Sequence, residues 1–287
     1  MLTLFNNIKS CICVCAMLLA MSGCTMRLNE STFIASSNTP VAFSDEFTQE
    51  LRAAIPNGVI TQVNIQTSDL ITLSGFHIDN PSSQKTLIFF QGNGMKIEPY
   101  GKSALRDLWS LGTDIFVLDR RGLGASEGEP SIKSLINDAQ LQLDYLHQHY
   151  QPQQVILHGY SLGSFIAADL AKNNKIDALV LHGSATNAED WVAEKTPWYI
   201  SPFMTLEISE DFRNADNLKV VSMYYNGPLL VIAGENDEEV PAKLAKKLFA
   251  QSKSANKQLI MVPNIGHQGM LENDDTMTQY QEFVGSL

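Results

Sequence analysis

The chain has 287 residues, of which 44% are hydrophobic, so it can bury the core of one large domain or two small ones. Its formal net charge of −11 argues against nucleic acid and anionic lipid as electrostatic partners. All four cysteines, Cys11, Cys13, Cys15 and Cys24, lie in the first 24 residues. A disulfide framework, a cysteine metal site and a cysteine nucleophile are therefore excluded from the rest of the chain.

The N-terminus resembles a bacterial lipoprotein signal. Residues 11–21 form a continuous apolar run that has the length of a signal core and is short for a membrane span. The run is followed by Ser22, Gly23 and Cys24. The resemblance implies a signal peptide over residues 1–23, cleavage before Cys24 and lipidation of that cysteine. An ordinary secretory signal or a short anchor is the alternative.

Residues 24–45 are predicted to be the lipidated cysteine and a polar tether, ahead of a domain over residues 46–287. Thr25, rather than Asp, follows the predicted lipidation site. This resembles outer-membrane sorting, and it implies a place in the bacterial cell envelope, on the periplasmic face of the outer membrane. The predicted membrane contact is the lipid anchor.

From about Val59 the pattern is one of strands alternating with helices. Residues 59–66 and 70–78 alternate apolar with polar side chains, as expected of an antiparallel edge. Six continuous apolar runs follow, as expected of strands covered on both faces. They are residues 86–92, 114–119, 154–159, 178–183, 228–234 and 258–263.

Helical patterns separate the apolar runs. Residues 131–149 place apolar side chains on one face behind a predicted N-cap at Ser131, and residues 99–111 end at Gly112. Further helices are predicted after Ser161, Pro241 and Asp274. This alternation predicts an α/β fold with a mostly parallel central sheet and helices on both faces. Residues 185–227 interrupt this alternation of strands and helices and are predicted to form a short cap insertion.

The sequence Gly159-Tyr160-Ser161-Leu162-Gly163 stands where a predicted parallel strand ends and a helix begins. A nucleophile there needs a sharp, strained turn that lifts its side chain above the sheet. The amides at the start of the helix favour a developing negative charge. We therefore predict that Ser161 is a catalytic nucleophile, although the pentapeptide alone is common in turns.

A serine nucleophile needs a base that is held in place by a third group. His267, in the loop after residues 258–263, is the predicted base. Asp237, after residues 228–234, is the predicted acid. Its rivals are Glu235, Glu238, Glu239 and Asp190. The other histidines suit an edge strand, an exposed helix or buried strand ends; they are His77, His147, His149, His158 and His182. A metal site at His158 and His182 would lack further carboxylate or cysteine ligands, so no metal is predicted.

The predicted oxyanion hole has two backbone amides. One belongs to Leu162, the residue after the nucleophile, and the other to Asn93, in the loop after residues 86–92. A plain glycine-rich turn at Asn93 is the alternative.

Together these segments resemble the α/β-hydrolase family. Residues 118–128, "LDRRGLGASEG", are similar to a turn that many of its members carry, in which Asp119, Arg121 and Gly122 are usually structural. Residues 226–241, "NGPLLVIAGENDEEVP", look like the branch of Bem46-like and ABHD-type serine hydrolases and serine aminopeptidase-like lipases. Gln91 departs from the family's usual histidine. The resemblance implies an α/β-hydrolase fold, no cofactor, and hydrolysis of carboxylic esters or thioesters of small molecules by Ser161, His267 and Asp237.

Two other functions compete with ester hydrolysis. A hydrolase fold can serve as a non-catalytic binding or envelope lipoprotein, and Gln91 supports that alternative. A serine peptidase would use the same three residues. The cap offers a weak indication of substrate, because its aromatic side chains line an apolar acyl pocket or simply pack the cap onto the sheet. These side chains are Trp191, Trp198, Tyr199, Phe203 and Met204.

Overall fold

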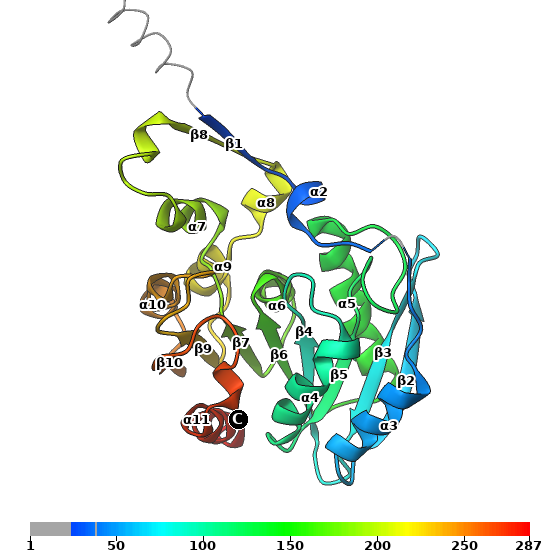
Figure 1. Ribbon diagram of the computed structural model, residues 1–287. Coiled ribbons are helices and arrows are strands. Elements are labelled where there is room, and N and C mark those ends of the chain that lie inside the picture. Colours follow the sequence, from blue (N-terminus) through cyan, green and yellow to red (C-terminus); the bar gives the residue numbers. More distant parts are fainter. Residues whose placement is uncertain (1–23, 38) are drawn as a thin grey trace, which may run out of the picture.

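The computed structural model describes residues 24–37 and 39–287 (Figure 1). The predicted signal peptide, residues 1–23, lies outside the described residues. Across these described ranges, no helix has both the length and the apolar character needed to cross a membrane.

The central sheet is mostly parallel, as the alternating pattern predicted. Within the described residues it has eight strands in the order β10-β9-β7-β6-β4-β5-β3-β2. The pair β2–β3 and the pair β3–β5 are antiparallel and the other pairs are parallel, so the predicted antiparallel edge is confirmed. The strands are β2 (Val59–Gln66), β3 (Thr72–Asp79), β4 (Lys85–Phe90), β5 (Asp114–Leu118), β6 (Gln154–Tyr160), β7 (Ala178–His182), β9 (Leu229–Gly234) and β10 (Lys257–Val262).

Helices cover both faces of this sheet. One apolar core lies beneath α5, α6 and α10, and the other lies beneath α3, α4 and α11. The strands between them are buried on both sides, so neighbouring side chains such as Leu87 and Ile88 enter opposite cores. The main helices are α3 (Asp45–Ala54), α4 (Lys102–Trp109), α5 (Ile132–His149), α6 (Leu162–Asn173), α10 (Ala242–Gln251) and α11 (Asp274–Gly285), with the short turns η1 (Ile97–Gly101) and η4 (Met270–Glu272). These features confirm the predicted α/β-hydrolase fold.

Local capping explains where α5 begins. The Ser131 hydroxyl accepts a hydrogen bond from the Ser134 amide, and the Ser134 hydroxyl accepts one from the Ser131 amide. This reciprocal pair satisfies two amides that the helix itself leaves without partners. The predicted N-cap is therefore confirmed.

The turn from β6 to α6 depends on close approaches of the backbone. A Cβ at Gly159 would lie 2.4 Å from the Gly163 carbonyl oxygen, and a Cβ at Gly163 would lie 2.0 Å from the Phe90 carbonyl oxygen. Both distances are far inside van der Waals contact, so only glycine fits at these two positions. The helix consequently packs directly against the ends of β4 and β6, with Ser161 at the apex between them.

The insertion between β7 and β9 carries its own short elements. These are α7 (Ala188–Lys195), η2 (Ser201–Phe203), β8 (Met204–Ile208), α8 (Glu210–Asn214), α9 (Asn217–Lys219) and η3 (Val220–Tyr224). In Figure 1, α7, β8 and α8 stand above the end of the sheet at which β6 meets α6. The insertion therefore occupies the place expected of a cap.

The start of the described chain differs from the expected polar tether. Residues Cys24–Leu28 form β1, which pairs in parallel with β8 of the cap, and Glu30–Phe33 form α2 (Figure 1). The Glu30 carboxylate accepts a hydrogen bond of 2.5 Å from the Ile132 amide at the start of α5. This stretch is therefore built into the fold, because its backbone finds partners on segments distant in sequence.

The close approach at Gly163 generates a stability prediction. We expect Gly163→Ala to lower the free energy of unfolding by about 3 kcal/mol, because its new methyl group has no room beside the Phe90 carbonyl. Gly285→Ala is the matched control, since no atom lies within 4 Å of its added Cβ. Urea unfolding of the two variants measures the difference. Equal stabilities would show that the turn is less tightly packed than described.

Candidate active site

Ser161 lies at the apex of the turn between β6 and α6. Its backbone has φ of 51° and ψ of −117°, a strained conformation for a residue with a side chain. The amide of Ser161 donates to the His182 carbonyl at 2.8 Å, which ties the turn to the end of β7. The side chain of Ser161 is half-buried and lines two cavities.

His267 and Asp237 form a buried pair. Nδ1 of His267 lies 2.7 Å from Oδ2 of Asp237, and the other carboxylate oxygen accepts from the amides of Glu239 and Val240 at 2.9 and 2.8 Å. Both side chains are less than 10% exposed. The carboxylate thus fixes the imidazole ring, whose Nε2 is left on the other side, where Ser161 and His267 line the same cavity.

The rival acids lie elsewhere. Glu235 and Glu238 are exposed, and Asp190 forms an ion pair of 2.7 Å with Lys247. Glu239 is closer, because its carboxylate lies 3.9 Å from Nε2 of His267, but its side chain is 68% exposed. Of the five candidate acids, Asp237 is the one that hydrogen-bonds His267.

Tyr160 and Gly183 both lie against the imidazole of His267. The Tyr160 ring stacks on His267 with a centroid separation of 5.2 Å, and its hydroxyl donates to the His267 carbonyl at 2.9 Å. A Cβ at Gly183 would lie 3.0 Å from Cε1 of His267. The residue just before the nucleophile therefore also positions the histidine, a role that the sequence analysis missed.

The two predicted oxyanion donors border the nucleophile. Leu162 is the first residue of α6, and Asn93 lines both cavities next to Ser161. The loop passes close by, since a Cβ at Gly92 would lie 3.3 Å from Cβ of Ser161. In the part of the chain that the structure describes, neither amide donates a hydrogen bond, so both are available to a ligand.

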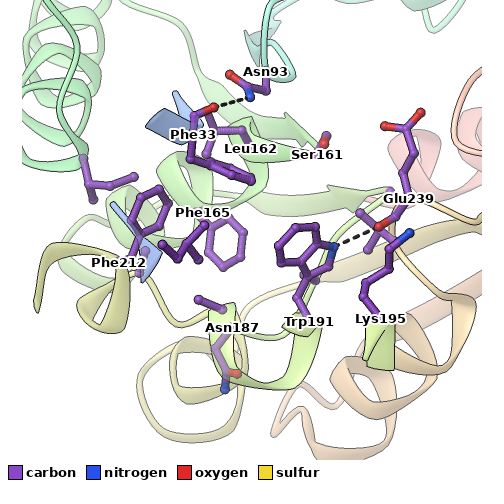
Figure 2. Close-up of a pocket in the computed structure, with 17 residues that line it drawn as sticks. Phe33, Asn93, Ser161, Leu162, Phe165, Asn187, Trp191, Lys195, Phe212 and Glu239 are labelled. Atoms are coloured by element: carbon purple, nitrogen blue, oxygen red, sulfur yellow. Dashed lines mark hydrogen bonds between the residues drawn. The ribbon is translucent and has the colours of Figure 1, made fainter. Parts of the chain in front are cut away.

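An apolar cavity of about 290 Å³ opens beside Ser161 (Figure 2). Polar groups are few along its walls, and aromatic rings from several segments converge on it, as in Figure 2. Such a cavity suits a hydrocarbon chain. Its apolar lining residues include Leu28, Phe33, Ile132, Phe165, Trp191, Phe212 and Val240.

This lining corrects the expectation for the cap aromatics. Of the five residues expected there, Trp191 lines the cavity, whereas Trp198 is 85% exposed and Tyr199 is 60% exposed. The aromatic walls come instead from Phe33, Phe165 and Phe212, which the sequence analysis missed. Phe33 lies in the supposed tether, and no local pattern could connect it with the cavity.

A second cavity, of about 550 Å³, lies on the other side of the nucleophile. It is lined in part by Tyr100, Tyr160 and His267, and it shares Asn93, Ser161 and Glu239 with the apolar cavity. Ser161 therefore stands at the junction of two spaces, of which the first is the more apolar.

Beneath the site lie the two histidines at the ends of β6 and β7. Nε2 of His158 is 3.2 Å from Nδ1 of His182, and the Tyr280 hydroxyl is 2.9 Å from Nδ1 of His158. Burial lowers the pKa of His158 to about 3 and holds the pKa of His182 well below its usual value, so both rings are neutral. Among the described residues, no group of three or more histidine, cysteine, aspartate or glutamate side chains could hold a metal ion.

The arginine-rich turn after β5 is held by ion pairs and hydrogen bonds of its own. Arg121 forms ion pairs with Asp138 at 2.8 Å and with Asp69 at 2.6 Å. Asp119 accepts hydrogen bonds from the amides of Ile97 and Ala125 at 2.7 and 2.9 Å, and burial raises its pKa to about 6. The segment organises a turn, in agreement with the structural role that the resemblance implied.

Comparisons with known proteins agree with this fold. A family model described as serine aminopeptidase, S33, matches residues 81–212. An esterase from Pyrococcus furiosus has a similar fold, with a TM-score of 0.67 and 19% identity over 88% of this chain and 98% of that one. The chain has the α/β-hydrolase fold.

Sequence relatives of this chain include the protein Bem46 from Schizosaccharomyces pombe, which is 26% identical over 88% of this chain and 87% of its own length. The α/β-hydrolase domain-containing protein WAV2 from Arabidopsis thaliana is 29% identical over 72% of this chain and 71% of its length. The lysophosphatidylserine lipase ABHD12 from Danio rerio is 30% identical over 61% of this chain and 50% of its length. The predicted resemblance to Bem46-like and ABHD-type proteins is thereby confirmed.

The buried histidine pair generates a prediction about pH. The unfolded chain takes up a proton on His158 below its ordinary pKa of 6.5, whereas the folded hydrolase does not until about pH 3. Unfolding therefore becomes easier as the pH falls. Between about pH 7.5 and about pH 5.5, this group lowers the free energy of unfolding by about 1.4 kcal/mol.

The variant His158→Gln removes this contribution. The change in its free energy of unfolding between the two pH values should therefore be about 1.4 kcal/mol smaller than the change in the wild type. Urea unfolding at each pH measures it. His147→Gln is the control, because His147 is exposed on α5, and it should keep the wild-type difference. An unchanged pH dependence in His158→Gln would contradict the neutral, buried pair.

Proposed function

We propose that this α/β hydrolase is a serine hydrolase that cleaves carboxylic esters, or thioesters, through an acyl-enzyme intermediate. The observation that carries the proposal is the placement of Ser161. It occupies a strained turn at the start of α6, shares a cavity with His267, and borders an apolar space that can take an acyl chain. His267 is in turn held at 2.7 Å by Asp237.

In the proposed mechanism Oγ of Ser161 attacks the ester carbonyl and Nε2 of His267 takes its proton. Asp237 keeps the remaining ring proton on Nδ1 and stabilises the imidazolium that forms. The amides of Leu162 and Asn93 bind the oxyanion, aided by the dipole of α6. His267 then protonates the leaving alcohol or thiol and activates a water molecule, which releases the acid. No cofactor takes part in these steps.

The shape of the site supports a substrate with an apolar acyl group. The acyl chain occupies the cavity that Phe33, Phe165 and Phe212 line, and the leaving group faces the second cavity. The lipase ABHD12 and the esterase from Pyrococcus furiosus, both similar to this chain, support an ester over other small molecules. A serine peptidase is the second candidate, because the matching family model is described as a serine aminopeptidase.

We further propose that the hydrolase is a lipoprotein, anchored through Cys24 to the periplasmic face of the bacterial outer membrane. The apolar run over residues 11–21 and the residues that follow it support this proposal. Cys24 is also the first residue of β1, so the anchor would join a folded strand directly. Globomycin treatment of expressing cells, with palmitate labelling, tests it: unprocessed precursor supports lipidation, and unlabelled, normally processed protein contradicts it.

Each proposed catalytic role predicts the effect of one substitution on activity. Ser161→Ala and His267→Ala should each lower kcat for p-nitrophenyl butyrate by about 10⁴-fold or more, and Asp237→Asn by about 10³-fold to 10⁴-fold. Only proteins with an activated serine should react with a fluorophosphonate probe. Steady-state kinetics and intact mass after labelling measure the two effects.

The exposed rival acid provides the control. Glu238→Gln should stay within about threefold of the wild type, because its side chain is exposed and has no contact with His267. A Ser161→Ala protein with full esterase activity would refute the mechanism. Aminopeptidase substrates tested on the same variants distinguish the peptidase: cleavage of peptides but not esters would favour it.

A further inference from the structure

The N-terminal arm, residues 28–37, lies against the apolar cavity beside Ser161. The Phe33 ring meets the Phe212 ring edge to face at 5.3 Å and the Trp191 ring at 5.7 Å. Phe33 and Leu28 both line the cavity. In Figure 2 the Phe33 side chain lies between Asn93 and the aromatic rings of the cavity wall. The arm thus closes a side of the cavity that the sheet and cap leave unfilled.

The Asn93 side chain fastens this arm to the loop that follows β4. Its Nδ2 donates a hydrogen bond to the Phe33 carbonyl at 2.8 Å (Figure 2). Its Oδ1 accepts a hydrogen bond from the Ala35 amide at 2.8 Å. The two bonds pair with the arm as a neighbouring strand would. Asn93 therefore holds the arm through its side chain, and it lines the same two cavities as Ser161.

Arg120 strengthens the attachment. This buried guanidinium donates to Oδ1 of Asn93 at 3.0 Å and to the Ala35 carbonyl at 3.3 Å. Farther along, the Ser37 amide donates to the Gly122 carbonyl at 2.6 Å. The arm is therefore fixed on both sides of Phe33, because Glu30, three residues earlier in α2, accepts a hydrogen bond from the Ile132 amide at the start of α5.

We propose that the arm is a permanent wall of the acyl-binding cavity, that Phe33 limits the length of the acyl chain, and that Asn93 is a positioning residue that holds the arm. The inference rests on the proposed function, since it assigns the apolar cavity to the acyl group of the ester. It identifies the substrate class as esters of apolar aliphatic acids. A larger side chain at position 33 shortens the cavity and a smaller one extends it.

The test measures chain-length preference in the full-length protein. The kcat/KM is determined for p-nitrophenyl esters from acetyl to lauroyl, and the lauroyl-to-butyryl ratio is compared. We expect Phe33→Ala to raise this ratio about tenfold and Phe33→Trp to lower it about tenfold, because the first change adds space for several methylene groups and the second removes space for about one. Opposite shifts exclude a general loss of packing, which would move both variants the same way.

Phe43→Ala is the matched control. Phe43 is half-buried like Phe33 and precedes α3, but it packs on Phe47 and Phe76 on the other face of the sheet. It should lower the melting temperature without moving the ratio by more than about twofold. Phe33 variants that fold, react with the fluorophosphonate and keep the wild-type ratio would overturn the inference and leave the proposed function standing. A folded wild type that neither reacts nor hydrolyses any ester would overturn both.

Hydrogen exchange tests the role of Asn93 without relying on activity. In Asn93→Ala, the amides of residues 31–37 should exchange about tenfold faster, since the arm loses both hydrogen bonds to that side chain. Asn174→Ala is the matched control, because the Asn174 side chain bonds Gln140 and the Leu170 carbonyl, away from the arm, and it should leave the exchange of residues 31–37 unchanged. Unchanged exchange in Asn93→Ala would show that Asn93 does not hold the arm.

Discussion

The close contact between α6 and the ends of β4 and β6 is the constraint on which the site depends. With glycine at positions 159 and 163, the helix can approach the strands closely enough that the connecting residue is forced to a positive φ. Ser161 occupies that position and is lifted between two cavities. The same geometry leaves the first amide of α6 without a partner among the residues that the structure describes, and this amide is the proposed oxyanion donor. Strain in the turn and exposure of the nucleophile thus have one origin.

The other groups of the site are arranged around this turn by contacts that reinforce one another. Tyr160 precedes the nucleophile and holds His267 by stacking and by a hydrogen bond. Asp237 is fixed by two backbone amides before it fixes the imidazole. The histidine is therefore oriented from both sides before any substrate arrives. Preorganisation of this kind reduces the reorganisation that the reaction needs.

Much of the fold and the site could be predicted from the sequence, because the signals are local. Doubly buried strands are continuous apolar runs, and the nucleophile turn is marked by glycines four residues apart. Ser161 directly follows β6, and Asp237 and His267 lie in the loops after β9 and β10, so the parallel sheet brings them to one edge.

The arm and the cavity wall could not be predicted, because they depend on contacts between distant residues. Phe33 and Asn93 are 60 residues apart, and Arg27 of β1 contacts Glu207 of β8 from 180 residues away. The stretch that contains Phe33 is polar in composition, so it was expected to be a tether. The cap aromatics were predicted only in part for a related reason. Trp191 lines the cavity as expected, but Trp198 and Tyr199 are exposed, while Phe165 of α6 lines the cavity.

The arm also connects the proposed lipid anchor to the apolar cavity. Phe33 lies nine residues after Cys24, a distance of at most about 30 Å in extended chain. A lipid at Cys24 would keep the acyl-binding cavity close to the bilayer, where long-chain esters are concentrated. The segment that fixes the hydrolase to the membrane would then also shape the cavity for its substrate.

The most direct test of the account is to trap the acyl-enzyme. The wild type is mixed with p-nitrophenyl butyrate, quenched in acid during turnover, and digested for peptide mass analysis. The account predicts a burst of about one p-nitrophenol per protein and a butyryl group on Ser161. Steady hydrolysis with no burst and no acyl group on the Ser161 peptide would contradict it, because the reaction would then proceed without this nucleophile.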